Sequence, residues 1–151
     1  MPAAKPTIAS NSALGLDNQL CFALYSASLA MTKLYKPLLE PLGLTYPQYL
    51  VMLVLWEQET MSVSELGERL FLDSGTLTPL LKRMETAALL LRQRSALDER
   101  RVDITLTPAG RKLKAGAAKI SACVLQAAGI PVSELVDLTR RVQALRSQLV
   151  D

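Results

Sequence analysis

The chain has no histidine and only two cysteines among its 151 residues. Without histidine it cannot build a Ser-His-Asp centre, a Cys-His centre or a histidine-ligated metal site. Two cysteines are also too few for a disulfide scaffold or a cysteine zinc site. We therefore expect no metal and no cofactor, and we expect Cys21 and Cys123 to be reduced at rest in a cytoplasmic protein.

Long apolar runs are also missing. The longest block, residues 49–56, is far too short to cross a bilayer, and the N-terminus lacks the apolar stretch of a signal peptide, so we expect no membrane association. Half of the residues are nevertheless apolar, which favours a dimer that hides surface between its subunits. The length predicts one domain over residues 1–151.

The positive charge is concentrated in one part of the chain. The net charge is only +3, but residues 82–112 hold eight basic and four acidic side chains. This stretch therefore carries more net positive charge than the chain as a whole. Such a concentration is what phosphate binding requires.

The apolar spacing predicts a mainly helical chain with one pair of strands. Asp17 is the candidate N-cap of the first helix, which Pro37 should kink or end. The pair Ser62 and Glu65 has the spacing of a capping box, and Thr107 is placed to cap a later helix. The expected elements are helices from 17 to about 40, 47–58, 62–72 and 76–88, strands 89–94 and 101–106, and helices 108–128 and 131–149.

Residues 62–107 have the element order of a winged helix-turn-helix, which places its second helix in the major groove of DNA. The helix after the turn at 73–75 has one apolar face and one short, polar, basic face. Pro79 is harmless there if Thr76 or Thr78 caps the helix, but costs a hydrogen bond if Ser74 does. The basic face alone could be an ordinary solvated surface; the basic hairpin that follows makes DNA binding the better interpretation.

We expect the helix to read the major groove, Arg100 to enter the minor groove, and Arg94 and Arg101 to contact phosphates. The winged region would span 44–107, with dimerisation helices at 14–43 and 108–151; the last helix has apolar residues at alternating spacings of three and four, a seam that suits a partner helix. The candidate DNA-contacting residues are Ser74, Thr76, Thr78, Pro79, Lys82, Arg83, Arg94, Asp98, Arg100 and Arg101.

Cys21 has two interpretations. A lone cysteine on an apolar helix face is most often a small buried hydrophobe. Here, however, it lies near a helix start, where unpaired N–H groups stabilise a thiolate, and all four tyrosines lie between residues 25 and 49. Tyr25 is one turn away, whereas Tyr35 is fourteen residues on, roughly 21 Å along the axis. A contact between Tyr35 and a Cys21 would therefore need two subunits, and we expect the same for Tyr46.

Cys123 is best explained by core packing when it is considered alone. As the second of two cysteines, it is also the sole candidate to resolve an oxidised Cys21, because sulfenic acid condenses with a nearby thiol.

Four segments resemble the multiple-antibiotic-resistance-regulator (MarR) family of winged-helix repressors, and specifically its two-cysteine branch that senses organic hydroperoxides. They are LCFALYSAS, GLTYPQYLVMLVLWE, LGERLFLDSGTLTPLLKRME and DERRVDITLTPAG, and the similarity covers about residues 16–150. The first and last segments occur family-wide, whereas the cysteine with Tyr35 and Tyr46 is specific to the hydroperoxide sensors.

The resemblance implies a homodimer with the element order α–α–α–α–β–β–α–α. It implies that Cys21 is the peroxidatic thiol, held as a thiolate by Tyr35 and Tyr46 of the partner subunit, and that Cys123 forms an intersubunit disulfide with it. Asp73 would brace a wing arginine. The reduced dimer would bind operator DNA and leave it on oxidation, derepressing a detoxification gene.

Besides an architectural DNA binder without a sensor function, which would show no redox response, two other functions fit part of the sequence. One is a related repressor that a small phenolic ligand releases, with inert cysteines. The other is a thiol peroxidase, although a turnover enzyme has no use for a basic wing, so we do not expect an enzyme.

Overall fold

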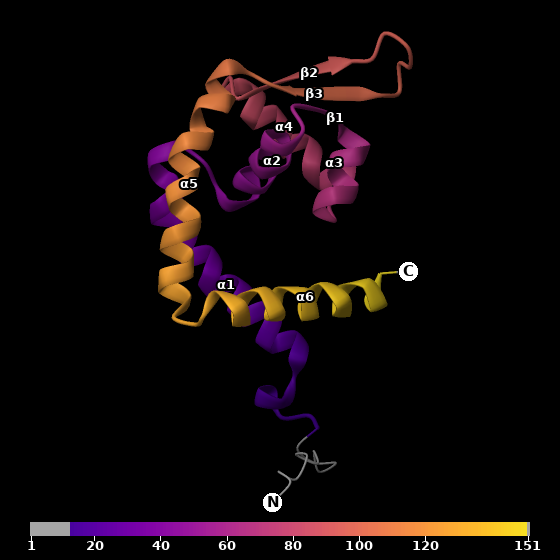
Figure 1. Cartoon of the computed structure of the whole chain (residues 1–151). Helices are drawn as coiled ribbons and strands as arrows, with labels where there is room; N and C mark the ends of the chain where they lie inside the picture. Colours follow the sequence, from indigo (N-terminus) through magenta and orange to yellow (C-terminus); the bar gives the residue numbers. More distant parts are fainter. Residues whose placement is uncertain (1–12, 151) are drawn as a thin grey trace, which may run out of the picture.

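The computed structural model describes residues 13–150 (Figure 1). It is mainly helical with a small antiparallel sheet, as the sequence predicts. Residues 44–107, here called the reading head, hold the sheet and three helices. The elements are η1 Leu16–Asn18, α1 Leu20–Leu39, η2 Glu40–Leu42, α2 Tyr46–Glu57, β1 Thr60–Ser62, α3 Val63–Leu70, α4 Ser74–Thr86, β2 Leu90–Arg94, β3 Val102–Leu106, α5 Pro108–Ala128 and α6 Val132–Leu149.

Local capping chemistry sets several helix starts. Ser62 and Glu65 form the predicted capping box at α3, each side chain bonding the other residue's backbone N–H. Thr107 accepts from the N–H of Gly110 at the start of α5, and its hydroxyl donates to the carbonyl of Ala88. Gly129, with a left-handed backbone, ends α5. These predictions are confirmed.

The first helix begins later than predicted. Asp17 lies in the short 3-10 turn η1, and Gln19 occupies the N-cap position of α1. Cys21 is consequently the second residue of the helix rather than one turn inside it. Pro37 does not end the helix, which continues to Leu39.

The cap of α4 also differs from the prediction. Neither Thr76, Thr78 nor Ser74 caps this helix; the side chain of Asp73 does, accepting from the backbone N–H of Thr76 at 2.7 Å. Pro79 is then the sixth helical residue, so it has no N–H to donate to the carbonyl of Gly75. The helix nevertheless continues to Thr86, with Leu77, Leu81 and Met84 buried on its other face.

The sheet has the strand order β1–β3–β2, with both pairings antiparallel. The pair β2 and β3 with the loop 95–101 forms the wing, as predicted, and β2 is an edge strand. The short strand β1 was not predicted; it pairs Met61 with Ile104. It joins the chain before α3 to the base of the wing.

The core lies between α2, α3, α4 and the sheet. Val51, Met52 and Leu55 of α2 are fully buried. The same buried cluster includes side chains from the rest of the reading head and from α1 and α5: Leu66, Leu77, Leu81, Met84, Leu90, Ile104, Leu39, Ala117, Ile120 and Val124. The indole of Trp56 donates to the carbonyl of Gly110, which fastens α2 to the first turn of α5.

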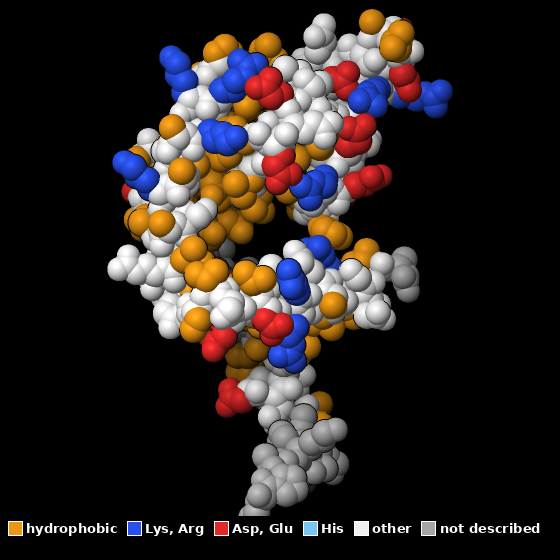
Figure 2. Space-filling view, viewed as in Figure 1, with side chains coloured by type: hydrophobic (Ala, Val, Ile, Leu, Met, Phe, Trp, Pro, Cys, Tyr) orange, Lys and Arg blue, Asp and Glu red, His pale blue; other side chains and the backbone are white. Residues whose placement is uncertain are grey.

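The remaining helices extend away from the reading head. α5 runs down from the wing, and α6 crosses beneath α2 and α3 (Figure 1). No residue of α6, described along its whole length, is buried. Both α1 and α6 expose large apolar side chains: Leu20, Phe22, Tyr25, Leu29, Met31, Val132, Val136, Leu138, Val142 and Leu149. An apolar-walled hollow separates α6 from the reading head (Figure 2).

Between residues 13 and 150, no helix by itself has the length and apolar character needed to cross a membrane, although the bent pairs α1–α2 and α5–α6 reach that mark jointly.

Candidate nucleic-acid interface and thiol site

Helix α4 has the two faces that the sequence predicts. Leu77, Leu81 and Met84 are buried in the core. The candidate DNA-contacting side chains point outward, with Thr78 partly exposed and the others exposed: Ser74, Thr76, Pro79, Lys82 and Arg83. The polar face is therefore available to a ligand along its whole length.

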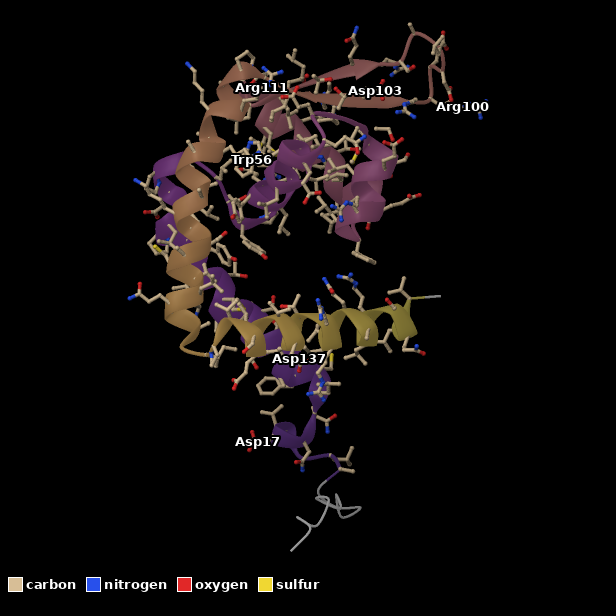
Figure 3. The ribbon with its side chains drawn as sticks, in the orientation of Figure 1. Asp17, Trp56, Arg100, Asp103, Arg111 and Asp137 are labelled. Atoms are coloured by element: carbon tan, nitrogen blue, oxygen red, sulfur yellow. The ribbon has the colours of Figure 1, made fainter. Side chains whose placement is uncertain are left out.

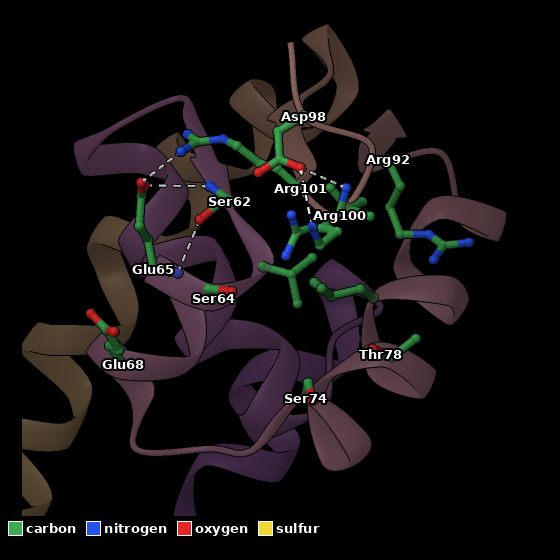
Figure 4. A pocket seen from close by; sticks show the side chains of 13 residues that line it. Ser62, Ser64, Glu65, Glu68, Ser74, Thr78, Arg92, Asp98, Arg100 and Arg101 are labelled. Carbon is green, nitrogen blue, oxygen red and sulfur yellow. Dashed lines mark hydrogen bonds and ion pairs between the residues drawn. The ribbon is translucent and has the colours of Figure 1, made fainter. Parts of the chain in front are cut away.

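The start of α4 and the wing share one open cleft of about 620 Å³. Ser74 and Thr78 line it from α4, and Asp98, Arg100 and Arg101 line it from the wing (Figure 4). The structure thus brings together five of the predicted site residues. Thr76, Pro79, Lys82, Arg83 and Arg94 do not line the cleft and lie on the surfaces around it.

The wing tip is ordered by its own backbone. The N–H of Arg100 donates to the Asp98 carboxylate at 3.0 Å, and the N–H of Ser95 donates to the carbonyl of Arg101 at 2.7 Å. The Arg100 guanidinium lies 3.9 Å from the Asp98 carboxylate, with its side chain 97% exposed. Such an exposed pair is weak, so Arg100 remains free to approach a ligand. Figure 3 shows Arg100 at the tip, far from Asp17.

Arg101 is engaged within the protein. Its Nε donates to Asp103 at 2.8 Å, and its guanidinium lies 3.3 Å from Glu65 of α3. The hydrogen bond from Arg101 to Asp103 raises the pKa of the guanidinium, with the charge of Glu65 adding to the effect. Arg101 therefore holds the wing to α3, a role that sequence reasoning missed when it assigned Arg101 to phosphates alone.

A second brace holds the base of the wing to α4. The backbone N–H of Arg92 donates to Glu85 at 2.8 Å, and its Nε donates to the same carboxylate at 3.4 Å. The backbone hydrogen bond is the main reason why the pKa of Glu85 is lowered. Neither residue was a predicted site residue, because their contact joins two elements that no local pattern relates.

Asp73 caps α4 in this structure, whereas the resemblance assigned it to bracing a wing arginine. The bond from the Thr76 backbone N–H lowers the pKa of the Asp73 carboxyl. A short carboxylate directly before a helix satisfies a free N–H of its first turn. The arginines of the wing instead form ion pairs with Asp98, Asp103, Glu65 and Glu85.

Cys21 is exposed in the first turn of α1. Tyr25, one turn further along the same helix, is 62% exposed. Both side chains lie in the first half of α1, where Leu20, Phe22 and Leu29 are exposed in a single protomer. The surface around the thiol is thus open for a second chain.

Tyr35 and Tyr46 lie together elsewhere, where α1 meets α2. Their ring centroids are 4.8 Å apart, and Tyr35 also lies 5.7 Å from the ring of Tyr49. Burial raises the pKa of both phenols, and neighbouring tyrosines raise it further. Both phenols therefore stay protonated and remain hydrogen-bond donors at neutral pH.

Cys123 is exposed on α5, so the interpretation as a core residue is wrong. Its neighbour Val124 is buried instead. One residue of shift on a helix turns a side chain by about 100°, which carries the thiol out of the core.

Three comparisons with known proteins agree with this geometry. The family described as transcriptional regulator SarA/Rot matches residues 33–116. The organic hydroperoxide resistance transcriptional regulator of Bacillus subtilis is 58% identical over 110 residues, which cover 73% of this chain and 75% of that protein.

Solved structures give the same result. Reduced AbfR bound to DNA, a protein of Staphylococcus epidermidis, matches with a TM-score of 0.78 and 34% identity, covering 95% of this chain and all of that one. Its disulfide form matches with a TM-score of 0.64 and 35% identity, covering 89% and 95% of the two chains. The chain therefore belongs to the MarR/SarA family of winged-helix regulators, whose members regulate transcription and are not enzymes.

Proposed function

We propose that the protein is a cytoplasmic, homodimeric repressor that binds operator DNA when reduced and releases it when an organic hydroperoxide oxidises Cys21. The observation that carries this proposal is the pairing of Tyr35 and Tyr46, whose ring centroids lie 4.8 Å apart. Two hydrogen-bond donors can stabilise a thiolate. Cys21 of the same subunit, however, lies roughly 21 Å from Tyr35 along the axis of α1. A second subunit would supply the thiol.

The proposal that the protein binds DNA depends on the cleft that α4 and the wing share. Ser74 and Thr78 at the start of α4 and Arg100 at the wing tip line one open surface. In a winged helix, such a surface sets one helix in the major groove and the wing on the flanking minor groove. A dimer would present two such surfaces to half-sites about one helical turn apart. The relative AbfR is known in a reduced form bound to DNA.

The chemistry needs one hydroperoxide for each Cys21, and the same two-electron oxidation serves the disulfide with Cys123. The Cys21 thiolate attacks the outer peroxide oxygen, the O–O bond breaks, and the alkoxide leaves and takes up a proton to become an alcohol. Cysteine is oxidised to sulfenic acid and the peroxide is reduced. The Cys123 thiol then attacks this sulfur, a disulfide forms, and the hydroxyl leaves as water. Both thiols are exposed, and a disulfide needs their Cα atoms within about 7 Å.

The decisive experiment measures operator binding before and after one equivalent of an organic hydroperoxide, with the thiols counted in parallel. We expect the wild-type protein to lose operator binding as Cys21 is consumed. Cys21→Ser should bind the operator equally well and ignore the peroxide. Release of the serine variant by the same dose would refute Cys21 as the sensor.

A ligand-released repressor is the second candidate, and one observation favours it. A largely apolar cavity of about 400 Å³ lies beside Tyr46, bordered by Thr32, Lys33 and Lys36. If this cavity takes a phenolic ligand, that ligand would release DNA from a protein whose thiols are alkylated. Under the redox proposal, the same ligand should leave the alkylated protein bound to DNA, so adding the ligand to one preparation gives opposite results for the two candidates.

A further inference from the structure

The last helix reaches back to the reading head at one place. α6 leaves the end of α5 and crosses beneath α3, with the hollow between them (Figures 1 and 2). Near its end, the guanidinium carbon of Arg146 lies 4.1 Å from the centre of the Phe71 ring. That is a cation–π contact of favourable geometry. It connects a helix with no buried residue of its own to the turn that precedes α4.

Phe71 is an unusual residue for its position. It ends α3 with a left-handed backbone, φ 57° and ψ 38°, where glycine or asparagine is ordinary. Its ring is also 54% exposed in the protomer. A strained backbone that holds an exposed aromatic side chain does not serve the core, so a functional constraint is the better explanation.

The residue that follows α6 lies near the same turn. Val150, one turn after Arg146, lines a shallow depression together with Phe71, Leu72 and Asp73. Asp73 is the residue that caps α4. The end of α6 and the segment that sets the start of the reading helix therefore border the same depression.

Several apolar side chains of α6 are uncovered in the protomer. Val136, Leu138 and Val142 are exposed and apolar. In the proposed dimer they would be covered by the partner subunit. α6 would then be fixed along its length by the dimer and would contact the reading head at its end.

We propose that Arg146 is a positioning residue that, through Phe71, fixes the orientation of each reading head relative to the dimer. The distance between the two α4 helices, and hence the spacing of the half-sites that the protein accepts, would follow from this contact. The inference rests on the proposed function, because it requires a DNA-binding dimer.

The test uses an operator selected from random DNA with the full-length wild-type protein. Binding is then measured on that operator and on versions with one base pair added or removed between the half-sites. We expect the wild-type protein to prefer the selected spacing. Arg146→Ala should reduce this preference by about two- to fivefold, the worth of a half-exposed cation–π contact. Binding to a single half-site should stay unchanged.

Several variants separate positioning from general damage. Arg146→Lys keeps a cation over the ring and should restore part of the preference, as should Phe71→Tyr, which keeps a ring. Phe71→Leu should behave like Arg146→Ala. Arg140→Ala removes an exposed arginine from the same helix and should leave the spacing preference intact.

The outcomes distinguish the two proposals. A wild-type protein that is dimeric and binds its operator, together with an Arg146→Ala variant of identical spacing preference, overturns the inference alone. An equal loss in Arg140→Ala, or no recovery in Arg146→Lys, also overturns it. A wild-type protein that selects no operator or stays bound after oxidation overturns the proposed function.

Discussion

The rings of Tyr35 and Tyr46 lie 4.8 Å apart, although one residue belongs to the end of α1 and the other opens α2. η2 and Gly43, with its left-handed backbone, turn the chain between them. The contact places two phenol groups in one half-buried site before any partner arrives. A protomer thus carries a preassembled pair of donors but holds its own thiol elsewhere.

We predict that Tyr35→Phe and Tyr46→Phe each slow the oxidation of Cys21 by roughly tenfold or more, because each removes one hydrogen bond to a charged sulfur. Stopped-flow measurement of thiol loss with an organic hydroperoxide tests this. Tyr49→Phe, in the same cluster, is the control and should react at the wild-type rate. Because burial raises the pKa of both phenols, neither should titrate between pH 6 and 9. Equal rates in all three variants would rule out the phenol–thiolate contact.

We predict that Cys123→Ser stops the reaction at the sulfenic acid. The thiol that would attack Cys21 is then missing, so no disulfide can form. Non-reducing gels of peroxide-treated protein should show a covalent dimer for the wild-type chain and none for Cys123→Ser. Mass spectrometry should find one added oxygen on Cys21. An unchanged covalent dimer would reject the pairing of the two thiols.

We predict different effects for two adjacent wing arginines. Arg100 is almost fully exposed, so Arg100→Ala should weaken operator binding and leave the melting temperature unchanged. The salt dependence of binding should also become weaker, because one positive charge at the DNA is lost. Arg101→Ala should also lower the melting temperature, because Asp103 and Glu65 lose their cation. Thermal melts and binding curves at several salt concentrations test both variants. Unaltered operator affinity in Arg100→Ala would show that Arg100 of the wing does not contribute to DNA binding.

We predict that Asp73→Ala lowers both stability and operator affinity, because the first turn of α4 loses its cap. Asp73→Asn should preserve both, since asparagine caps equally well, and Asp17→Ala serves as the control. The pKa of Asp73 is lowered from 3.8 in the folded protein, so its stabilisation is present above that value and lost as pH falls through the folded pKa. Melts between pH 2 and 7 should show this acid-dependent loss in the wild-type protein and a smaller one in Asp73→Asn. Identical acid profiles would contradict the assignment.

Sequence patterns predicted correctly those features that depend on residues close together in the sequence. The capping box of Ser62 and Glu65, the cap at Thr107, the end of the helix at Gly129 and the antiparallel strand pair of the wing all follow from local chemistry. The apolar and polar faces of α4 follow from helical periodicity in the same way.

The remaining features depend on tertiary contacts or on unusual backbone. Phe71 and Ala88 adopt positive φ without being glycine, so no sequence signal marked the two corners beside α4. The pairs Arg101–Glu65 and Arg92–Glu85 join separate elements, and only their spatial proximity reveals them. Cys123 illustrates a third case, in which an error of one residue in helical phase reverses a burial assignment.

The strand order β1–β3–β2 has a consequence for the behaviour of the protein at high concentration. A sheet edge with free backbone groups invites strands from other molecules and so promotes aggregation. One edge here is a strand of only three residues, and the other, β2, carries Arg92 and Arg94. The shortness of β1 and the positive charge of β2 both disfavour the addition of another strand. The arginines of the wing therefore also protect the protein from self-association through its sheet.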